Sequence, residues 1–266
     1  MPKSAHLAAV TEDHHRSGAQ TVERAITILN LFRDGADSLG ISAIARATGL
    51  NVSTAHRLVK TLVHEHFMEQ DQMTEQYRLG TALAILGQRA VQSSGIGLAQ
   101  PVLDRLGEAT GESVSLAVRR GDDVVVMLQS ASRQALRFDH PTGGSINIHA
   151  SGMGKVLLAF AEQDLKSAVG ALGRLPKFTA STITTQAALL GALESVRALG
   201  YATNREERYA GVCGVAAPVL DTRGIARYAV GVQGPAVRLT DARLHELAAD
   251  VVRAAAEISE LVLRGR

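Results

Sequence analysis

A polar and cationic stripe runs through residues 42–64, on a segment with the periodicity of a helix. If a helix begins near Val52 and advances by about 100° per residue, Arg57 and Lys60 point to the same side. Ser53 and His64 share that side, and the opposite side is apolar: Ala55, Leu58, Val59 and Leu62. No Asp or Glu stands between Ser38 and His64, so DNA phosphates would meet no repulsion there. The stripe predicts DNA contact, although a stripe taken alone also fits a solvated helix face.

Two short helices around a tight turn are predicted to position this stripe. Ser42 is expected to cap the first helix, and Gly49 stands where a helix C-terminus takes a left-handed residue. Asn51 is expected to cap the second helix by accepting a backbone N–H. This arrangement is typical of helix-turn-helix DNA binding. The residues expected to face DNA are therefore Arg46, Asn51, Ser53, Arg57, Lys60 and His64.

A preceding helix and a following hairpin are expected to complete a winged unit. A helix is expected to begin at Thr21 and to end at Gly35. Its apolar stripe can cover the back of the two helices and consists of Val22, Ala25, Ile26, Leu29 and Phe32. Phe67 and Glu69, then Tyr77 and Leu79, alternate around a polar turn at 71–74, which predicts a β-hairpin. The hairpin carries several acids and Arg78 as its only cation, so we expect the cationic helix to dominate DNA contact.

Other patterns that could carry chemistry fail on spacing. The run GMGKV at 152–156 lacks the first glycine of a phosphate loop and ends in Val156, and the GxG at 95–97 lacks its third glycine. Cys213 lies in an apolar run with no nearby histidine, which indicates a buried thiol. The charged turn at 205–208 is typical of a solvated loop, or could hold a polar ligand at the mouth of a sheet. We expect no catalytic residues, no cofactor and no metal site.

Composition narrows the class further. The chain has 266 residues, is 46% hydrophobic and carries 28 basic against 26 acidic side chains, so it can hold two domains, and its global charge does not indicate a partner. Aromatic residues make up only 3%, which leaves few platforms for stacking single-stranded bases and favours duplex DNA. The single cysteine fits a reducing compartment, and no apolar run is long enough for a membrane span. We expect a cytoplasmic protein.

The chain is predicted to consist of a flexible leader at 1–20, a DNA-binding domain at 21–80, a linker helix at 81–94 and a second domain at 95–266. The linker is too apolar for a solvated rod, so it should pack on another helix or subunit. In the second domain we expect helices at 101–109, 152–161, 185–199 and 240–263. Strands are expected at 113–118, 124–129, 136–139, 145–148, 201–204, 212–220 and 226–233, with a hairpin turn at 221–224. Grouped helices and hairpins predict an α+β fold with a largely antiparallel sheet.

Five segments, in this order, resemble the IclR (isocitrate lyase regulator) family of bacterial transcription factors. They are STAHRLVKTL (53–62), YRLG (77–80), HASGMGKVLLA (149–159), NREERYAGVCGVAAPVLD (204–221) and GPAVRLT (234–240). The resemblance implies a winged helix-turn-helix, a linker helix and a GAF-like effector-binding domain, assembled as a homodimer or a dimer of dimers on a palindromic operator. It places Ser53, Thr54, His56 and Arg57 at double-stranded DNA, where Arg57 can bind guanine through both of its terminal nitrogens. Val52 stands where the family often has a basic residue.

The resemblance also implies the residues of a pocket for a small organic effector: Ser151, Gly152, Met153, Gly154, Glu206, Glu207, Gly214, Gly231 and Gln233. This chain departs from the family at three of them. Gly214 replaces a frequent cysteine, with Cys213 one residue earlier and so expected to face the other side of the strand. Gly231 and Gln233 replace two serines. The pocket therefore has fewer small hydrogen-bond donors. Since a buried carboxylate needs several hydrogen bonds, this disfavours two- or three-carbon acids such as glyoxylate or pyruvate and suggests a larger, aromatic or partly apolar acid.

These observations predict an effector-responsive, DNA-binding transcription regulator, with repression favoured over activation. One alternative is a regulator whose second domain serves only for assembly. A remote alternative is an enzyme built on the second domain.

Overall fold

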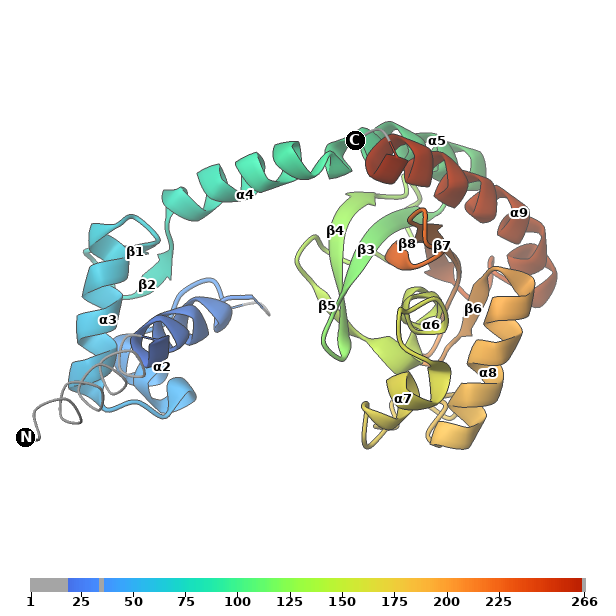
Figure 1. The fold of residues 1–266 in the computed structure, drawn as a ribbon. Coiled ribbons are helices and arrows are strands. Elements are labelled where there is room, and N and C mark those ends of the chain that lie inside the picture. Colours follow the sequence, from blue (N-terminus) through green and yellow to red (C-terminus); the bar gives the residue numbers. More distant parts are fainter. Residues whose placement is uncertain (1–18, 34–35, 265–266) are drawn as a thin grey trace, which may run out of the picture. The chain divides into compact units, whose positions relative to one another are not determined.

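The computed structural model describes residues 19–33 and 36–264. Their contacts divide the chain into two compact units, Met1–Ala90 and Val91–Arg266. Each unit has its own hydrophobic core, and Figure 1 shows the elements of both. The predicted leader at 1–20 lies outside the described residues as far as residue 18, and so does Gly35. Ala19 and Gln20 already belong to a helix that covers 19–30.

The first unit contains the predicted pair of helices, α2 (Ile41–Thr48) and α3 (Val52–His64). Gly49 ends α2 in the left-handed conformation, with φ of 68°, and the Asn51 side chain caps α3 by accepting a 2.8 Å hydrogen bond from the Thr54 N–H. Both expectations are confirmed. The cap expected at Ser42 is wrong, because α2 begins at Ile41 after Gly40. Leu39 pairs with Tyr77 through two 2.9 Å backbone hydrogen bonds, which holds the chain extended until the helix starts.

The helix of residues 19–30 and a two-stranded wing complete this unit. The predicted stripe is confirmed in part: Phe32 enters the core and Leu29 packs against it, together with the unpredicted Ile28, whereas Val22 and Ile26 are at least half exposed. The wing pairs β1 (Met68–Gln70) with β2 (Tyr77–Leu79) in antiparallel register.

Each strand of the wing buries one large side chain, and one of the two, Tyr77, belongs to the predicted alternation. Met68 and Tyr77 are buried, whereas Leu79 is 42% exposed. The turn between the strands is closed by the Asp71 carboxylate, which accepts from the Met73 and Thr74 N–H groups. These hydrogen bonds lower the pKa of Asp71 below its ordinary value.

Helix α4 (Thr81–Ser94) follows the wing and has no buried residue. Ile85 is 62% and Leu86 53% exposed. Gly95 follows α4 in the left-handed conformation. The division between the units falls within α4, after Ala90.

The second unit is built on a six-stranded antiparallel sheet in the order β5-β4-β3-β8-β7-β6. Its strands are β3 (Ser113–Arg120), β4 (Asp123–Ser130), β5 (Ser145–Asn147), β6 (Ala202–Arg205), β7 (Val212–Leu220) and β8 (Ala226–Pro235). The predicted α+β class with an antiparallel sheet is confirmed, and β7 has the predicted bounds. No helix among the described residues combines the length and apolarity that crossing a bilayer requires.

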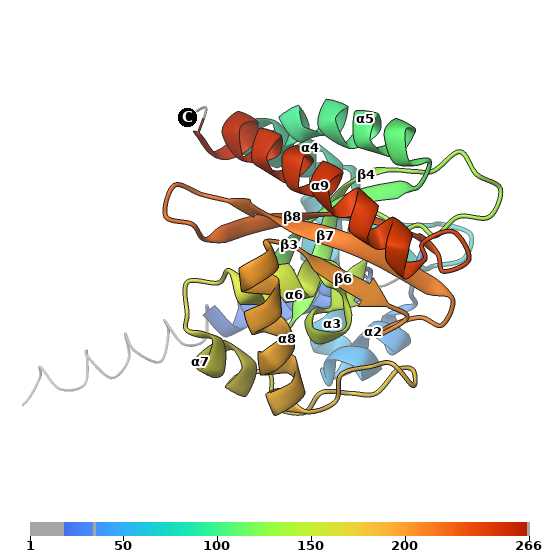
Figure 2. The same cartoon turned by 90° about the vertical axis from the view of Figure 1, so that its right-hand side faces the viewer.

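Helices cover both faces of this sheet (Figures 1 and 2). One face packs against α5 (Gln100–Thr110) and α9 (Asp241–Ile258). The 3₁₀ turn η1 (Ile96–Ala99) directly precedes α5. Thr240 caps α9 as predicted, and a π-helical turn, Ser259–Arg264, continues it. The other face packs against α6 (Gly152–Ala159), α7 (Leu165–Gly170) and α8 (Gln186–Leu199). The 3₁₀ turn η2 (Ile148–Ala150) leads into α6.

Residues 136–139 do not form the predicted strand. Side chains of other elements contact this segment at two points. The Asp139 carboxylate accepts from Ser113 and Gln129, and the Leu136 carbonyl accepts from Arg238. The segment therefore remains a loop between β4 and β5.

Candidate DNA interface and effector pocket

The candidate DNA interface is the outward face of α3 together with Arg46 of α2. The exposed residues are Arg46, Asn51, Ser53, His56, Arg57, Lys60 and His64, and Thr54 is half-buried. Ala55, Leu58 and Val59 enter the core, so packing of one side presents the other to solvent. Within the described part of the chain, Arg46, Arg57 and Lys60 form no ion pair with an acidic side chain. Their charges are available to phosphates.

Asn51 and Ser53 stand at the start of this face. The Asn51 Oδ1 accepts from the Thr54 N–H and from the Ser53 hydroxyl, the latter at 3.0 Å. Asn51 therefore orients the first turn of α3. The wing offers less positive charge to DNA, because Arg78 forms an ion pair with Glu69 at 3.1 Å.

A cavity of about 30 Å³ lies in the second unit, beside the first half of β7 and the last half of β8. Six residues that the sequence assigned to the pocket line it: Ser151, Gly152, Met153, Gly214, Gly231 and Gln233. Ten further residues complete the lining: His140, Ile146, Ala150, Asn204, Arg208, Tyr209, Val212, Val215, Ala216 and Val232. Strand alternation could have indicated Ala216, two residues after Gly214. The contributions of His140 and Tyr209 depend on loops that carry no local signal.

The replacements on β7 and β8 leave this cavity tightly packed. A Cβ on Gly214 would lie 2.7 Å from the Val232 carbonyl, and one on Gly231 would lie 3.0 Å from the Met153 Cγ. Gln233 donates a 2.7 Å hydrogen bond to the buried Ser115 hydroxyl. Cys213 lies in the core with α5 and α9, on the other side of the strand as expected, and burial raises the pKa of its thiol.

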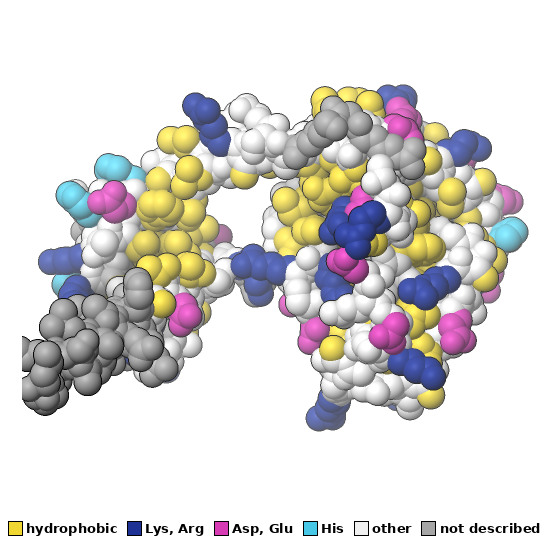
Figure 3. Space-filling model, viewed as in Figure 1, with side chains coloured by type: hydrophobic (Ala, Val, Ile, Leu, Met, Phe, Trp, Pro, Cys, Tyr) yellow, Lys and Arg dark blue, Asp and Glu magenta, His cyan; other side chains and the backbone are white. Residues whose placement is uncertain are grey.

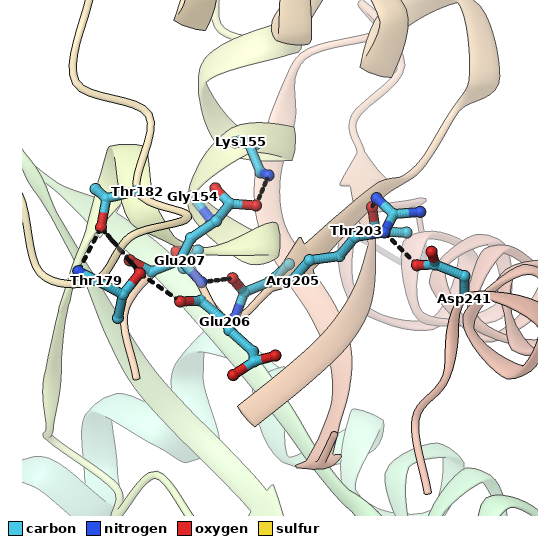
Figure 4. A network of polar contacts seen from close by, with 11 residues as sticks. Gly154, Lys155, Thr179, Thr182, Thr203, Arg205, Glu206, Glu207 and Asp241 are labelled. Atoms are coloured by element: carbon cyan, nitrogen blue, oxygen red, sulfur yellow. Dashed lines mark hydrogen bonds and ion pairs between the residues drawn. The ribbon is translucent and has the colours of Figure 1, made fainter. Parts of the chain in front are cut away.

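Gly154, Glu206 and Glu207 were assigned to the pocket but are not among its lining residues. Gly154 sits where a Cβ would fall 1.9 Å from the Ile148 carbonyl oxygen, so it is required for packing. Glu206 has a left-handed φ of 57°, and its carboxylate accepts from the Gly211 N–H. Glu207 turns away to pair with Lys155, with 2.5 Å between Oε1 and Nζ (Figure 4).

Glu207 is the last residue of the turn at 204–207, and its ion pair with Lys155 is buried. Burial lowers the pKa of Lys155, although the Glu207 charge opposes that effect. Thr182 donates to the Glu207 carbonyl and Thr179 to the Glu206 carbonyl, at 2.6 and 2.7 Å. The Asn204 Oδ1 accepts from the Glu207 N–H at 3.0 Å. These bonds make the turn a fixed support for Arg208, the next residue.

Arg208 and four aromatic rings cluster at one end of the cavity, where Arg208, His140 and Tyr209 belong to the lining. The Arg208 guanidinium carbon is 3.9 Å from the Phe178 ring centroid and 4.7 Å from that of Tyr209. Phe138 contacts both His140 and Tyr209, with ring centroids 4.7 and 5.2 Å apart. Burial, followed by the charge of Arg208, lowers the pKa of His140 from 6.5 to about 4. His140 is therefore uncharged at neutral pH.

A winged helix-turn-helix with an exposed cationic face, on the same chain as an α+β domain with a lined pocket, defines a DNA-binding transcription regulator. Comparison with known proteins agrees. The model of the IclR helix-turn-helix domain matches residues 21–72, and that of the bacterial transcriptional regulator IclR C-terminal domain matches residues 88–260. The chain belongs to the IclR family.

Curated relatives are regulators as well. The chain is 37% identical to the HTH-type transcriptional regulator BhcR of Paracoccus denitrificans, over 91% of this chain and 87% of the relative. It is 33% identical to the HTH-type transcriptional repressor AllR of Escherichia coli, over 90% of this chain and 89% of the relative.

Solved structures share the fold across both units. The IclR of Thermotoga maritima has a TM-score of 0.70 and 26% identity, over 92% of this chain and 99% of the other. An IclR homolog from Microbacterium hydrocarbonoxydans, complexed with 4-hydroxybenzoate, has a TM-score of 0.79 and 25% identity, over 92% of this chain and all of the other.

Proposed function

We propose that the protein is an effector-responsive repressor that binds operator DNA through the outward face of α3. The observation that carries the proposal is a set of three exposed cations, Arg46, Arg57 and Lys60, that form no ion pair with any described residue. They lie on and beside a helix whose other face is buried. Arg57 reads bases, and Arg46 and Lys60 contact phosphates. Asn51, Ser53, Thr54, His56 and His64 border the same surface. The repressor relative AllR supports the sign of regulation.

The proposed effector site is the cavity of the second unit, and the proposed effector is a larger or partly aromatic organic acid. Two observations support this class. The Microbacterium homolog binds an aromatic acid, and the β7 and β8 replacements remove small hydroxyl and thiol donors from the lining. Effector binding would change the affinity for DNA by favouring one arrangement of the units over another.

We propose a homodimer, or a dimer of dimers, acting in the cytoplasm. Hydrophobic side chains are exposed together on the first unit (Figure 3), and those of helix 19–30 and α4 are Val22, Ile26, Ile85 and Leu86, each at least half exposed. Such a patch on a protein that binds DNA is typical of a subunit interface. Two copies of α3 would then meet two halves of a palindromic operator.

A second candidate function is a regulator whose second unit only assembles the oligomer. The small cavity favours it, because about 30 Å³ holds one or two water molecules. A thermal-shift screen with organic acids separates the two functions. A rise in the melting temperature of the second unit supports the effector-responsive form.

The DNA-binding surface is tested by fluorescence anisotropy with the promoter DNA beside the protein's own gene, in a salt titration. Arg57→Ala should weaken binding roughly 10- to 100-fold if Arg57 reads a base. Arg133→Ala removes the same charge from a 91% exposed side chain of the second unit and should leave binding unchanged. Equal binding by Arg57→Ala and the wild type would refute the proposed surface.

A further inference from the structure

Arg208 is a cation whose hydrogen-bonding capacity is not used within the described structure. Its guanidinium lies over the Phe178 and Tyr209 rings, and its Nε is buried without a hydrogen-bond partner. No ion pair joins Arg208 to an acidic side chain of the described residues. The adjacent Glu207 is already engaged by Lys155. Aromatic faces stabilise a guanidinium without occupying its N–H donors.

The surroundings of Arg208 give the cavity a positive end. Arg208 is the only Lys or Arg among the described lining residues, and none of these residues is Asp or Glu. His140 lines the same cavity in its uncharged form at neutral pH, because burial and then the charge of Arg208 lower its pKa to about 4. A ligand with one negative charge would therefore meet one uncompensated positive charge.

Most of the remaining lining is apolar or small. Ile146, Met153 and Val212 contribute side chains, and Gly152, Gly214 and Gly231 contribute bare backbone. The polar groups number three besides those at the aromatic end: Ser151, Asn204 and Gln233. All three are partly engaged: Ser151 accepts from the Gly154 N–H, Asn204 accepts from the Glu207 N–H, and Gln233 donates to Ser115. Such a lining suits the body of an apolar molecule better than a second charge.

We infer that Arg208 binds the carboxylate of the effector, and that the effector is a monocarboxylic acid with an apolar body. This inference depends on the proposed function, in which the cavity is the effector site. The planar guanidinium can donate two parallel hydrogen bonds to a carboxylate, and its position over two rings restricts its orientation in advance. Arg208 is thus a specificity-determining residue: it selects acids over neutral molecules of the same shape.

The Phe138–His140–Tyr209 ring cluster must move for such an acid to enter. His140 and Tyr209 line the cavity, and their ring centroids are 6.3 Å apart, with Phe138 in contact with both. A volume of about 30 Å³ is too small for an acid with a six-carbon body. Phe138 and His140 belong to the loop at 131–144 and Tyr209 to the turn at 206–211, and rotation of these three side chains would leave the strand pairings and the hydrogen-bonded turn at 204–207 in place.

Isothermal titration calorimetry on the full-length protein tests the inference with a defined set of probes. The acids are benzoate, 4-hydroxybenzoate and hexanoate, and benzyl alcohol is the neutral counterpart of benzoate. The wild type should bind at least one acid, and benzoate at least tenfold more tightly than benzyl alcohol. Arg208→Gln should weaken acid binding about tenfold or more and leave benzyl alcohol unchanged. The acid affinity of Arg208→Lys should lie between those of the wild type and Arg208→Gln, since lysine keeps the positive charge but lacks the planar pair of N–H donors.

Arg205→Gln is the matched control. Arg205 is three positions earlier, is 55% exposed and pairs with Asp241 outside the cavity lining, so the same charge change should leave acid binding as in the wild type. The melting temperature without ligand checks that each variant folds. If Arg208→Gln is unstable, the comparison of Arg208→Lys with the wild type carries the test.

Three results would overturn the inference: Arg208→Gln binding acids as the wild type does, benzyl alcohol binding as tightly as benzoate, or no binding of any acid at millimolar concentration. A failure of the proposed function has a different signature. There the acids bind in an Arg208-dependent manner, but the anisotropy of promoter DNA with the protein does not change when they are added.

Discussion

The ammonium group of Lys155 and the carboxylate of Glu207 form a buried ion pair, 2.5 Å from Nζ to Oε1, with side chains only 7% and 8% exposed. The pair joins α6 to the turn that carries Arg208, 52 positions later in the chain. The second carboxylate oxygen, Oε2, is buried without a partner. The pair therefore fixes one wall of the cavity through charges that do not contact its contents.

Removing one partner of this pair should be more damaging than removing both. Glu207→Gln leaves the Lys155 ammonium buried and unpaired, and should lower the free energy of unfolding by about 3 kcal/mol. The double variant Lys155→Met/Glu207→Leu should lose less free energy of unfolding than Glu207→Gln does, because it leaves no buried charge unpaired. Urea unfolding followed by circular dichroism measures both.

The exposed pair Arg243–Glu246, 41% and 64% exposed, is the control for that comparison. Glu246→Gln should cost less than about 1 kcal/mol. Equal losses from Glu207→Gln and Glu246→Gln would show that burial of the Lys155–Glu207 pair has no energetic consequence.

Gly234 makes room for a second ion pair, in which the carboxylate is buried and the arginine is partly exposed. A Cβ at this position would lie 2.3 Å from Glu112 Oε2, and Glu112 is a buried carboxylate that binds Arg238 with 2.8 Å between Oε2 and Nη2. Gly234→Ala should therefore displace Glu112 and lower stability by about 2 kcal/mol or more. Gly191→Ala is the matched change in α8, where a Cβ meets nothing within 4 Å. It should raise stability by up to about 1 kcal/mol. A loss from Gly191→Ala equal to that from Gly234→Ala would contradict this explanation.

Stability of the second unit should fall in mild acid because of His140. Its pKa is lowered from 6.5 to about 4 in the folded state, so the unfolded chain binds a proton more readily. The stabilisation is present above pH 6.5 and declines as the pH falls toward about 4, by up to about 3 kcal/mol. Calorimetry between pH 7 and pH 4.5 measures the decline, which His140→Asn should reduce.

Asp139 does not confuse this measurement. Burial would raise its pKa, but hydrogen bonds from Ser113 and Arg137 outweigh that effect and lower the pKa below 3.8. Stability that depends on Asp139 is therefore lost only at lower pH. A pH profile that is the same with and without His140 would refute the assignment.

Ile85→Glu and Leu86→Glu should weaken self-association without unfolding the protein. Both side chains are more than half exposed on α4, so a charge there costs little in a monomer but would be buried in the proposed interface. Sedimentation velocity should show a shift toward the monomer at a given concentration, with the melting temperature nearly unchanged. The equivalent exposed change in the second unit, Leu199→Glu at a 59% exposed position, should leave the sedimentation of the protein unchanged. An unaltered oligomeric state in both α4 variants would place the interface elsewhere.

The sequence by itself determined the features that depend on neighbouring residues. Gly49 and Asn51 define the turn between α2 and α3 because a left-handed residue and a side-chain cap act over three or four positions. The cationic face of α3 and the bounds of β7 follow from periodicity, which is also local. The exposed polar and cationic side chains of α3 could therefore be predicted before any coordinates.

Only the tertiary structure decided which distant side chains meet. Leu39 pairs with Tyr77 just before α2 begins, and Asp139 and Leu136 bind side chains of other elements in a segment that forms no strand. The cavity gathers His140 and Arg208 from two loops, while Lys155 withdraws Glu207 from it. Pairings across tens of residues depend on packing and desolvation, which no local pattern encodes.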